Sequence, residues 1–144
     1  MKKEKITLLK PKKGNSIGQC LIEQGISAGF PSPADDFKEI RISLDKELVK
    51  NSESTFYARV SGDSMEGAGI SDGDLLVIDR SLEPKNNKIA VCFLDGDFTV
   101  KRINKKGGQL YLKPENKDYQ EIVINEENEL IIWGIVTYVI KSLN

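Results

Sequence analysis

A serine in a tight turn and a lysine in an apolar strand are the two residues of this chain whose surroundings point to chemistry. Ser64 lies in the run SGDSM, and Lys101 lies in the run FTVKR. The sequence contains no histidine, which excludes a Ser-His-Asp triad and a histidine metal site. A serine nucleophile therefore needs another base, and a lysine withdrawn from water can supply it. If Ser64 is a nucleophile, Lys101 is therefore the candidate base of a serine hydrolase.

The turn that contains Ser64 has two interpretations. Gly62 lets the chain bend sharply and brings backbone N–H groups near the hydroxyl, where they can form an oxyanion hole. The same run is also an ordinary loop, because serine, glycine and aspartate are common turn formers. Taken alone, the motif favours the loop.

Lys101 also has two interpretations. Alternation along the predicted strand places Thr99, Lys101 and Ile103 on one face, and Phe98, Val100 and Arg102 on the other. The lysine is either solvated, which is the commoner case, or held against apolar neighbours. Burial disfavours the charged form of a lysine, and a neutral amine can accept the proton of Ser64.

The first 37 residues differ in composition and hydrophobic pattern from the rest of the chain. They contain Pro11, Pro31 and Pro33, four glycines, and no long amphipathic stretch. We interpret residues 1–37 as a mobile N-terminal arm, which is too short and too interrupted to supply a helix-turn-helix DNA reader.

From residue 38 to residue 144 the sequence predicts a compact, mainly antiparallel β domain. Asp95-Gly96 is a strong hairpin signal, and KKGG at 105–108 marks another hairpin candidate. Only DKELVK at 45–50 has a helical pattern. The predicted strands are EIRISL (39–44), TFYARVS (55–61), LLVIDR (75–80), KIAVCFL (88–94), FTVKRI (98–103), QLYLKP (109–114), YQEIVI (119–124) and LIIWGIVTYVI (130–140).

Composition narrows the class of protein. The 144 residues carry a net charge of −1, and the pI is about 5.6. This charge disfavours direct binding of the protein to the phosphates of DNA. Cys20 and Cys92 are unclustered and fit a reducing compartment. Neither a signal-peptide core nor a membrane span is visible, so we expect a soluble cytoplasmic protein.

Acidic and basic clusters have simpler explanations than binding sites. Most of the aspartates in SDGD and LDGD occupy turn positions, where aspartate stabilises the backbone of the turn. No metal or other cofactor is therefore predicted. The basic run KRINKK at 101–106 is short and spans a strand end, which favours a solvated turn over a nucleic-acid contact. The aspartates considered are Asp72, Asp74, Asp79, Asp95 and Asp97.

Five segments in order resemble the UmuD branch of the self-cleaving LexA/UmuD family of peptidases. They are AGFPSPADDF (28–37), SGDSM (61–65), GISDGDLLVID (69–79), DGDFTVKR (95–102) and WGIVTYVIK (133–141). The resemblance runs from about residue 28 to the C-terminus and implies the LexA/UmuD catalytic fold.

The resemblance also implies roles for particular residues. Ser64 would be the nucleophile, Lys101 the general base, and the bond between Ala28 and Gly29 the substrate. The backbone N–H groups of Asp63 and Ser64 are the candidates for the oxyanion hole. The Ala-Gly bond is of the LexA type, whereas UmuD proteins can cut at Cys-Gly; Cys20 therefore lies outside the cleavage chemistry.

By the same resemblance, the chain is an SOS-response protein that forms a homodimer. A RecA filament on single-stranded DNA would stimulate the cut, and the shortened product would join UmuC in error-prone translesion DNA synthesis. Three alternatives remain: a non-enzymatic polymerase-binding module, a LexA-like repressor fragment, and a signal-peptidase-like enzyme acting on other proteins.

Overall fold

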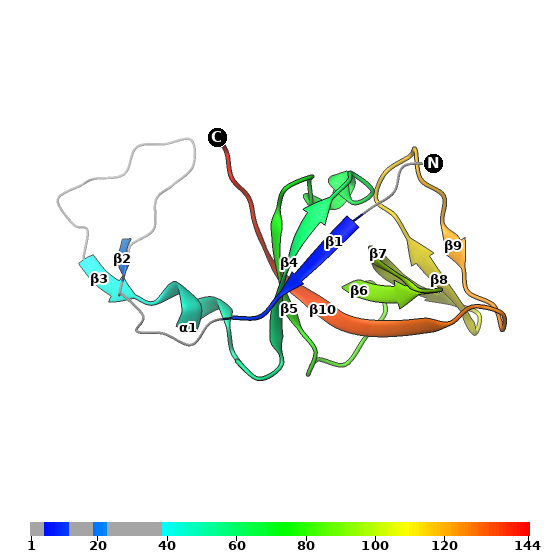
Figure 1. Cartoon of the computed structure of the whole chain (residues 1–144), viewed down its shortest axis with the longest axis horizontal. Helices are drawn as coiled ribbons and strands as arrows, with labels where there is room; N and C mark the ends of the chain where they lie inside the picture. Colours follow the sequence, from blue (N-terminus) through cyan, green and yellow to red (C-terminus); the bar gives the residue numbers. More distant parts are fainter. Residues whose placement is uncertain (1–4, 12–18, 23–38) are drawn as a thin grey trace. The chain divides into compact units, whose positions relative to one another are not determined.

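The computed structural model describes residues 5–11, 19–22 and 39–144 of the chain. The chain forms two compact units (Figure 1). One unit comprises Met1–Pro11 and Asn51–Asn144, and the other comprises Lys12–Lys50. Most of the predicted arm, including the bond between Ala28 and Gly29, lies outside the described residues.

Among its described residues, 19–22 and 39–50, the smaller unit contains a two-stranded antiparallel sheet and one short helix. Strand β2 (Gln19–Ile22) pairs with β3 (Glu39–Ile42), and the helix α1 (Leu44–Leu48) follows. Ser43 caps the helix, because its hydroxyl accepts a bond from the backbone N–H of Lys46. The strand predicted at 39–44 and the helical turn predicted at 45–50 are both confirmed, apart from their exact ends.

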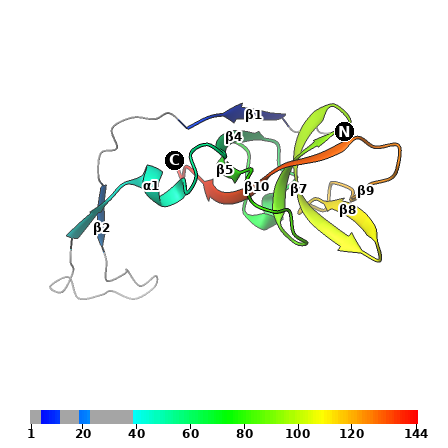
Figure 2. The ribbon, with the colours of Figure 1, turned by 90° about the horizontal axis from the view of Figure 1, so that it is seen from below.

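The larger unit contains an eight-stranded sheet in which every neighbouring pair is antiparallel. The strand order is β1-β4-β5-β10-β6-β7-β8-β9, as can be followed in Figures 1 and 2. This architecture confirms the mainly antiparallel β fold. The strands are β1 (Lys5–Leu9), β4 (Thr55–Ser61), β5 (Leu75–Asp79), β6 (Ile89–Leu94), β7 (Asp97–Lys106), β8 (Gln109–Lys113), β9 (Ile122–Val123) and β10 (Leu130–Ile140).

Two tight hairpins set the register of the strand that carries Lys101. Asp95 and Gly96 join β6 to β7 with positive φ angles of 48° and 94°, as a two-residue hairpin requires. Gly107 and Gly108 join β7 to β8 with φ angles of 56° and 79°. Both hairpins were predicted, and together they align β7 between its two neighbours.

The central strand β10 bends the sheet. It pairs with β5 on one side and with β6 on the other, and the register shifts once on each side. Such bulges increase local twist and curvature. Gly134 lies at one of these shifts, and a Cβ there would meet Cγ2 of Ile78 at 2.5 Å, so only glycine permits this close packing.

Strand β1 was not among the predicted strands. It pairs along the outer edge of β4, with Lys5 opposite Ser61 and Leu9 opposite Tyr57. Ile6 and Leu8 pack against the core. Five residues carry too weak an alternation to be recognised alone, so this strand is defined by the edge to which it pairs.

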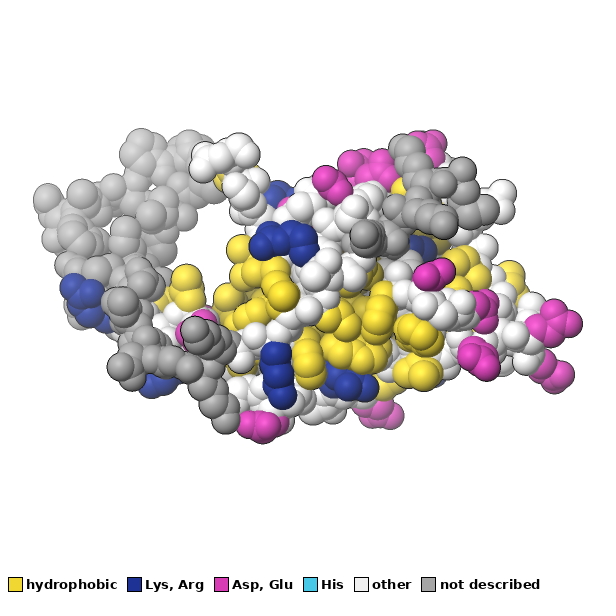
Figure 3. Space-filling view, viewed as in Figure 1, with side chains coloured by type: hydrophobic (Ala, Val, Ile, Leu, Met, Phe, Trp, Pro, Cys, Tyr) yellow, Lys and Arg dark blue, Asp and Glu magenta, His cyan; other side chains and the backbone are white. Residues whose placement is uncertain are grey.

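The curl brings strands that are distant in the sheet into contact. Strand β1, at one edge, also contacts β7, which lies two strands from the other edge. The main core lies within this curl, and apolar side chains cover the middle of the face seen in Figure 3. The buried members of this core are Ala58, Val60, Met65, Ile70, Leu76, Ile78, Val91 and Val100. A second core joins Ala90, Cys92, Ile103, Leu112 and Ile135.

Candidate active site

Ser64 and Lys101 meet in the folded chain although 37 positions separate them. The side-chain nitrogen Nζ of Lys101 lies 3.2 Å from the hydroxyl Oγ of Ser64. Ser64 follows β4, and Lys101 lies on β7, with β5, β10 and β6 between these strands in the sheet order. The curl of the sheet therefore creates this contact.

Both members of the pair are withdrawn from water. Ser64 is 1% exposed and Lys101 is 5% exposed. Of the two interpretations of Lys101, the structure supports a lysine held inside the protein over a solvated one. A charged lysine in such a place needs polar partners, because burial without them is costly.

Among the described residues, three oxygen atoms lie within hydrogen-bond distance of the lysine nitrogen. Besides Ser64 Oγ, Nζ lies 2.6 Å from Oγ1 of Thr99 and 3.0 Å from the carbonyl oxygen of Val100. Thr99 and Lys101 are two positions apart on β7, and their bond agrees with the alternation that placed them on one face. Thr99 and Val100 thus hold Nζ in place, and its remaining bonding direction points at Ser64 Oγ.

The turn that presents Ser64 is built by local bonds. Gly62 has a φ of 108°, which favours glycine, and its N–H donates to Oδ1 of Asp72 at 2.8 Å. The short 3₁₀ helix η2 (Glu66–Ala68) begins directly after Met65, which is buried in the main core. The turn is therefore anchored on both sides of the serine.

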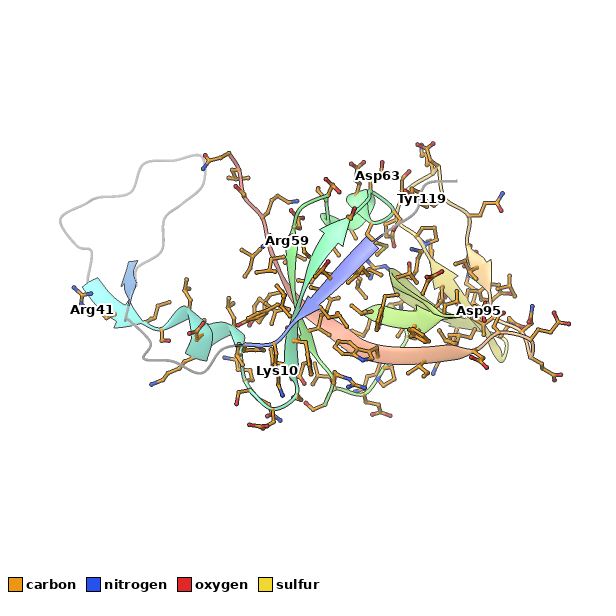
Figure 4. All side chains as sticks on the ribbon, in the orientation of Figure 1. Lys10, Arg41, Arg59, Asp63, Asp95 and Tyr119 are labelled. Atoms are coloured by element: carbon orange, nitrogen blue, oxygen red, sulfur yellow. The ribbon has the colours of Figure 1, made fainter. Side chains whose placement is uncertain are left out.

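A second segment, residues 115–119, holds the same turn from outside; we call it the clamp segment. The N–H of Glu115 donates to the carbonyl oxygen of Ser64 at 2.9 Å. Nδ2 of Asn116 donates to the carbonyl oxygen of Asp63 at 2.8 Å. The hydroxyl of Tyr119 donates to Oδ1 of Asp63 at 2.7 Å, and Figure 4 shows these two residues side by side.

The clamp segment is also tied to the strand of the lysine. Nε of Arg102 donates to Oε1 of Glu115 at 2.7 Å, in an ion pair that is about three quarters buried at both side chains. Because Arg102 directly follows Lys101, the clamp segment links β7 to the turn of Ser64 by a second route.

Cys92 lies close to the site on the neighbouring strand. Burial raises the pKa of its thiol from the ordinary 9.0 to about 12, against the opposing effect of the nearby charge of Lys101. The thiol is therefore protonated at neutral pH, and this cysteine is a packing residue of the second core.

Four of the five aspartates considered as metal ligands accept hydrogen bonds from backbone N–H groups. Asp72 accepts from Gly62, Asp74 from Ser71, Asp79 from Ser81, and Asp95 from Glu129. These bonds agree with the turn geometry that the motifs predicted.

Sequence reasoning did not find Thr99 or the clamp segment as parts of the site. The spacing of Thr99 and Lys101 on one strand face was a usable signal. Asn116 offered none, because its contact with Asp63 spans 53 positions and depends on the curl of the sheet. Of the predicted site residues, the structure brings together Asp63, Ser64 and Lys101, while Ala28 and Gly29 are outside the described residues.

The chain matches the Peptidase S24-like family over residues 20–137. Among curated proteins, it is 43% identical to Protein MucA of Salmonella typhimurium over 116 residues, which are 80% of this chain and 79% of that protein. It is 37% identical to Protein ImpA of Escherichia coli over 130 residues, 90% of this chain and 88% of that protein. Both relatives are of the UmuD type.

A LexA repressor from Shewanella sediminis is also similar. It is 38% identical over 127 residues, which cover 88% of this chain but only 61% of the repressor. Among the described residues, no helix is both long and apolar enough to cross a membrane.

Proposed function

The chain belongs to the Peptidase S24-like family, as a UmuD-like member, and on this premise we propose that it cleaves its own backbone between Ala28 and Gly29. One observation carries the proposal: the 3.2 Å approach of Lys101 Nζ to Ser64 Oγ inside the protein. A hydroxyl and an amine in hydrogen-bond contact can exchange a proton directly, which is the first requirement for a serine nucleophile with a lysine base.

In the first half of the reaction, the neutral amine of Lys101 takes the proton of Ser64. The serine oxygen attacks the carbonyl carbon of Ala28, and the negative charge that develops on the carbonyl oxygen is stabilised by the N–H groups of Asp63 and Ser64. The C–N bond to Gly29 then breaks, and the Lys101 ammonium returns its proton to the leaving amine. Ala28 remains bound to Ser64 as an ester.

In the second half, water replaces the departed segment. Lys101 takes a proton from the water as it attacks the ester carbonyl, and it returns that proton to Ser64 Oγ when the ester bond breaks. The products are residues 1–28 with a free carboxylate and residues 29–144 with a free amino group. No metal or cofactor takes part in this scheme.

The biological role that we propose follows the family. A RecA filament on single-stranded DNA stimulates the cut by favouring the docked arrangement of the cleavage segment over its other arrangements. The shortened chain, as a homodimer in the cytoplasm, then joins UmuC in error-prone translesion synthesis. The similarity to Protein MucA and Protein ImpA over most of both chains supports this assignment over that of a repressor.

The two dyad residues are tested by comparing cleavage rates across a pH series. The full chain should cut itself faster as pH rises, because only the neutral amine accepts a proton. Ser64→Ala and Lys101→Arg should both be inactive, since arginine keeps the positive charge but stays protonated. Continued cleavage at the same bond by either purified variant would contradict the assigned roles.

A further inference from the structure

Asn116 controls the direction of one peptide group next to the nucleophile. The peptide that joins Asp63 to Ser64 is planar, and in the trans form its C=O and N–H groups point in opposite directions. Its carbonyl oxygen accepts from Nδ2 of Asn116 at 2.8 Å and from the N–H of Glu66 at 3.2 Å. Fixing the carbonyl therefore fixes the direction of the Ser64 N–H.

We propose that Asn116 is a positioning residue that orients the Ser64 N–H toward the developing oxyanion. The inference rests on the proposed function, in which that N–H stabilises the transition state. Asn116 makes no hydrogen bond to Lys101 or to the hydroxyl of Ser64. It acts on the site only through the backbone carbonyl of Asp63. Donors that are aimed before the reaction stabilise the transition state most effectively.

The side chain of Asn116 is itself held in the required orientation. Its Oδ1 accepts from the N–H of Asp118 at 2.9 Å, which leaves the amide nitrogen facing Asp63. The opposite amide orientation would place oxygen against oxygen at Asp63 and nitrogen against N–H at Asp118. The hydrogen bonds therefore determine which end of the amide faces the turn.

The backbone on either side of Asn116 is also anchored to the site. Glu115 donates its N–H to Ser64 O at 2.9 Å and accepts from the N–H of Gly67 at 2.7 Å. Its carboxylate is paired with Arg102. Asn116 is thus presented from a segment that is bonded to residues before and after the nucleophile, which makes it a rigid support rather than a surface loop residue.

The test uses the full chain with Asn116→Ser, followed by self-cleavage across a pH series. The serine hydroxyl can still accept from Asp118, but it is one bond too short to reach Asp63. The cleavage rate should fall by roughly 10²-fold, the loss expected for one oxyanion donor. The pH at half-maximal rate should not move, because the oxygen atoms around Lys101 are unchanged.

A matched control makes the same change at Asn125. Its Oδ1 also accepts from the N–H two residues later, that of Glu127, at 2.9 Å. The hydroxyl in Asn125→Ser can likewise still accept from Glu127, so this variant should cleave at the wild-type rate. A second pair, Asn116→Asp and Asn125→Asp, preserves side-chain size; Asn116→Asp replaces the donor to Asp63 with an acceptor and should also be slow.

Melting temperatures separate a local effect from unfolding. If either Asn116 variant melts like its control and cleaves at the wild-type rate, the inference is overturned while the proposed function stands. If both Asn116 variants are slow and also melt far below their Asn125 controls, lost folding accounts for the slow rate, which also overturns the inference. If the wild-type chain and both Asn125 controls fail to cleave, the proposed function fails and the inference falls with it.

Discussion

The hydroxyl of Thr99 lies 2.6 Å from the amine nitrogen of Lys101, closer than the serine that the lysine faces. The lysine nitrogen donates hydrogen bonds to the hydroxyl of Thr99 and to the carbonyl oxygen of Val100. The lysine is therefore held by its own strand, and the serine is brought to it by another part of the sheet.

Replacing Thr99 with valine should slow self-cleavage by roughly 10²-fold, because a base displaced by about an ångström loses its alignment with the nucleophile. Valine keeps the branched shape and removes only the hydroxyl. Thr99→Ser retains the hydroxyl and should cleave nearly as fast as the wild type. Equal rates for the valine and serine variants, measured by gel densitometry over time, would show that the hydroxyl does not hold the lysine.

Gly67→Ala should impair the site from the opposite side. A Cβ at this position would lie 2.7 Å from the carbonyl oxygen of Glu115, which is backbone and must move away. The movement would pull the clamp segment from Ser64 and reduce the cleavage rate by roughly ten-fold or more.

Gly107→Ala is the matched control for Gly67→Ala. Gly107 has a φ of 56° and nothing within 4 Å of an added Cβ, so alanine costs about 1 kcal/mol of backbone strain at a hairpin far from the clamp. Both variants should melt at lower temperature, but only Gly67→Ala should cleave slowly. Parallel losses of rate and stability in the two variants would contradict the role given to the clamp segment.

Cys92 should make the protein less stable in alkali. Its thiol has a pKa of about 12 when folded and an ordinary value of 9.0. Below pH 9 both states keep the proton, whereas above it the unfolded state releases a proton that the folded state retains. The free energy of unfolding should therefore fall by up to about 1.4 kcal/mol per pH unit between these two pKa values from this residue alone.

The measurement compares Cys92→Ala with the parent, both carrying Ser64→Ala so that no cleavage intervenes. Urea unfolding followed by the fluorescence of Trp133 gives the free energy at each pH from 8 to 10.5. The alanine variant should be less stable at pH 8 because of the small cavity, but it should lose less stability as pH rises. Identical slopes would mean that the thiol does not keep its proton in the folded state.

Cleavage should also release strand β1. The cut removes the covalent link between residues 1–28 and the rest of the chain, so this fragment would be held by the pairing of β1 with β4, by Ile6 and Leu8, and by the pairing of β2 with β3. A five-residue edge strand without a covalent link is marginal. Size-exclusion chromatography at micromolar concentration should separate the two products, and the β4 amides should exchange faster than in uncleaved Ser64→Ala. Co-elution of the fragments would contradict this expectation.

Much of the larger unit could be predicted because its strands carry their own signals. TFYARVS matches β4 residue for residue, and the glycine hairpins fix the limits of β6, β7 and β8. Alternation on β7 also identified the face that Lys101 shares with Thr99. These features are local, and local patterns are legible in a single sequence.

The remaining features depend on the curl of the sheet, which no local pattern encodes. The bond between Asn116 and Asp63 exists only because distant parts of the sheet approach one another, and β1 is defined by the edge of β4 to which it pairs. Even the dyad was ambiguous from its residues alone, since SGDS is also an ordinary loop and the commoner strand lysine is solvated. The resemblance to a family, rather than the pattern, favoured the catalytic interpretation.

The central claim, that Ser64 and Lys101 act on the chain's own Ala28–Gly29 bond, is tested most directly by intact-mass measurement. The full chain is incubated with RecA, single-stranded DNA and ATP, beside Ser64→Ala under the same conditions. We predict two products corresponding to residues 1–28 and 29–144 from the wild type and an unchanged mass from the variant. An uncut wild type, a cut at another bond, or equal cutting of Ser64→Ala would contradict the claim.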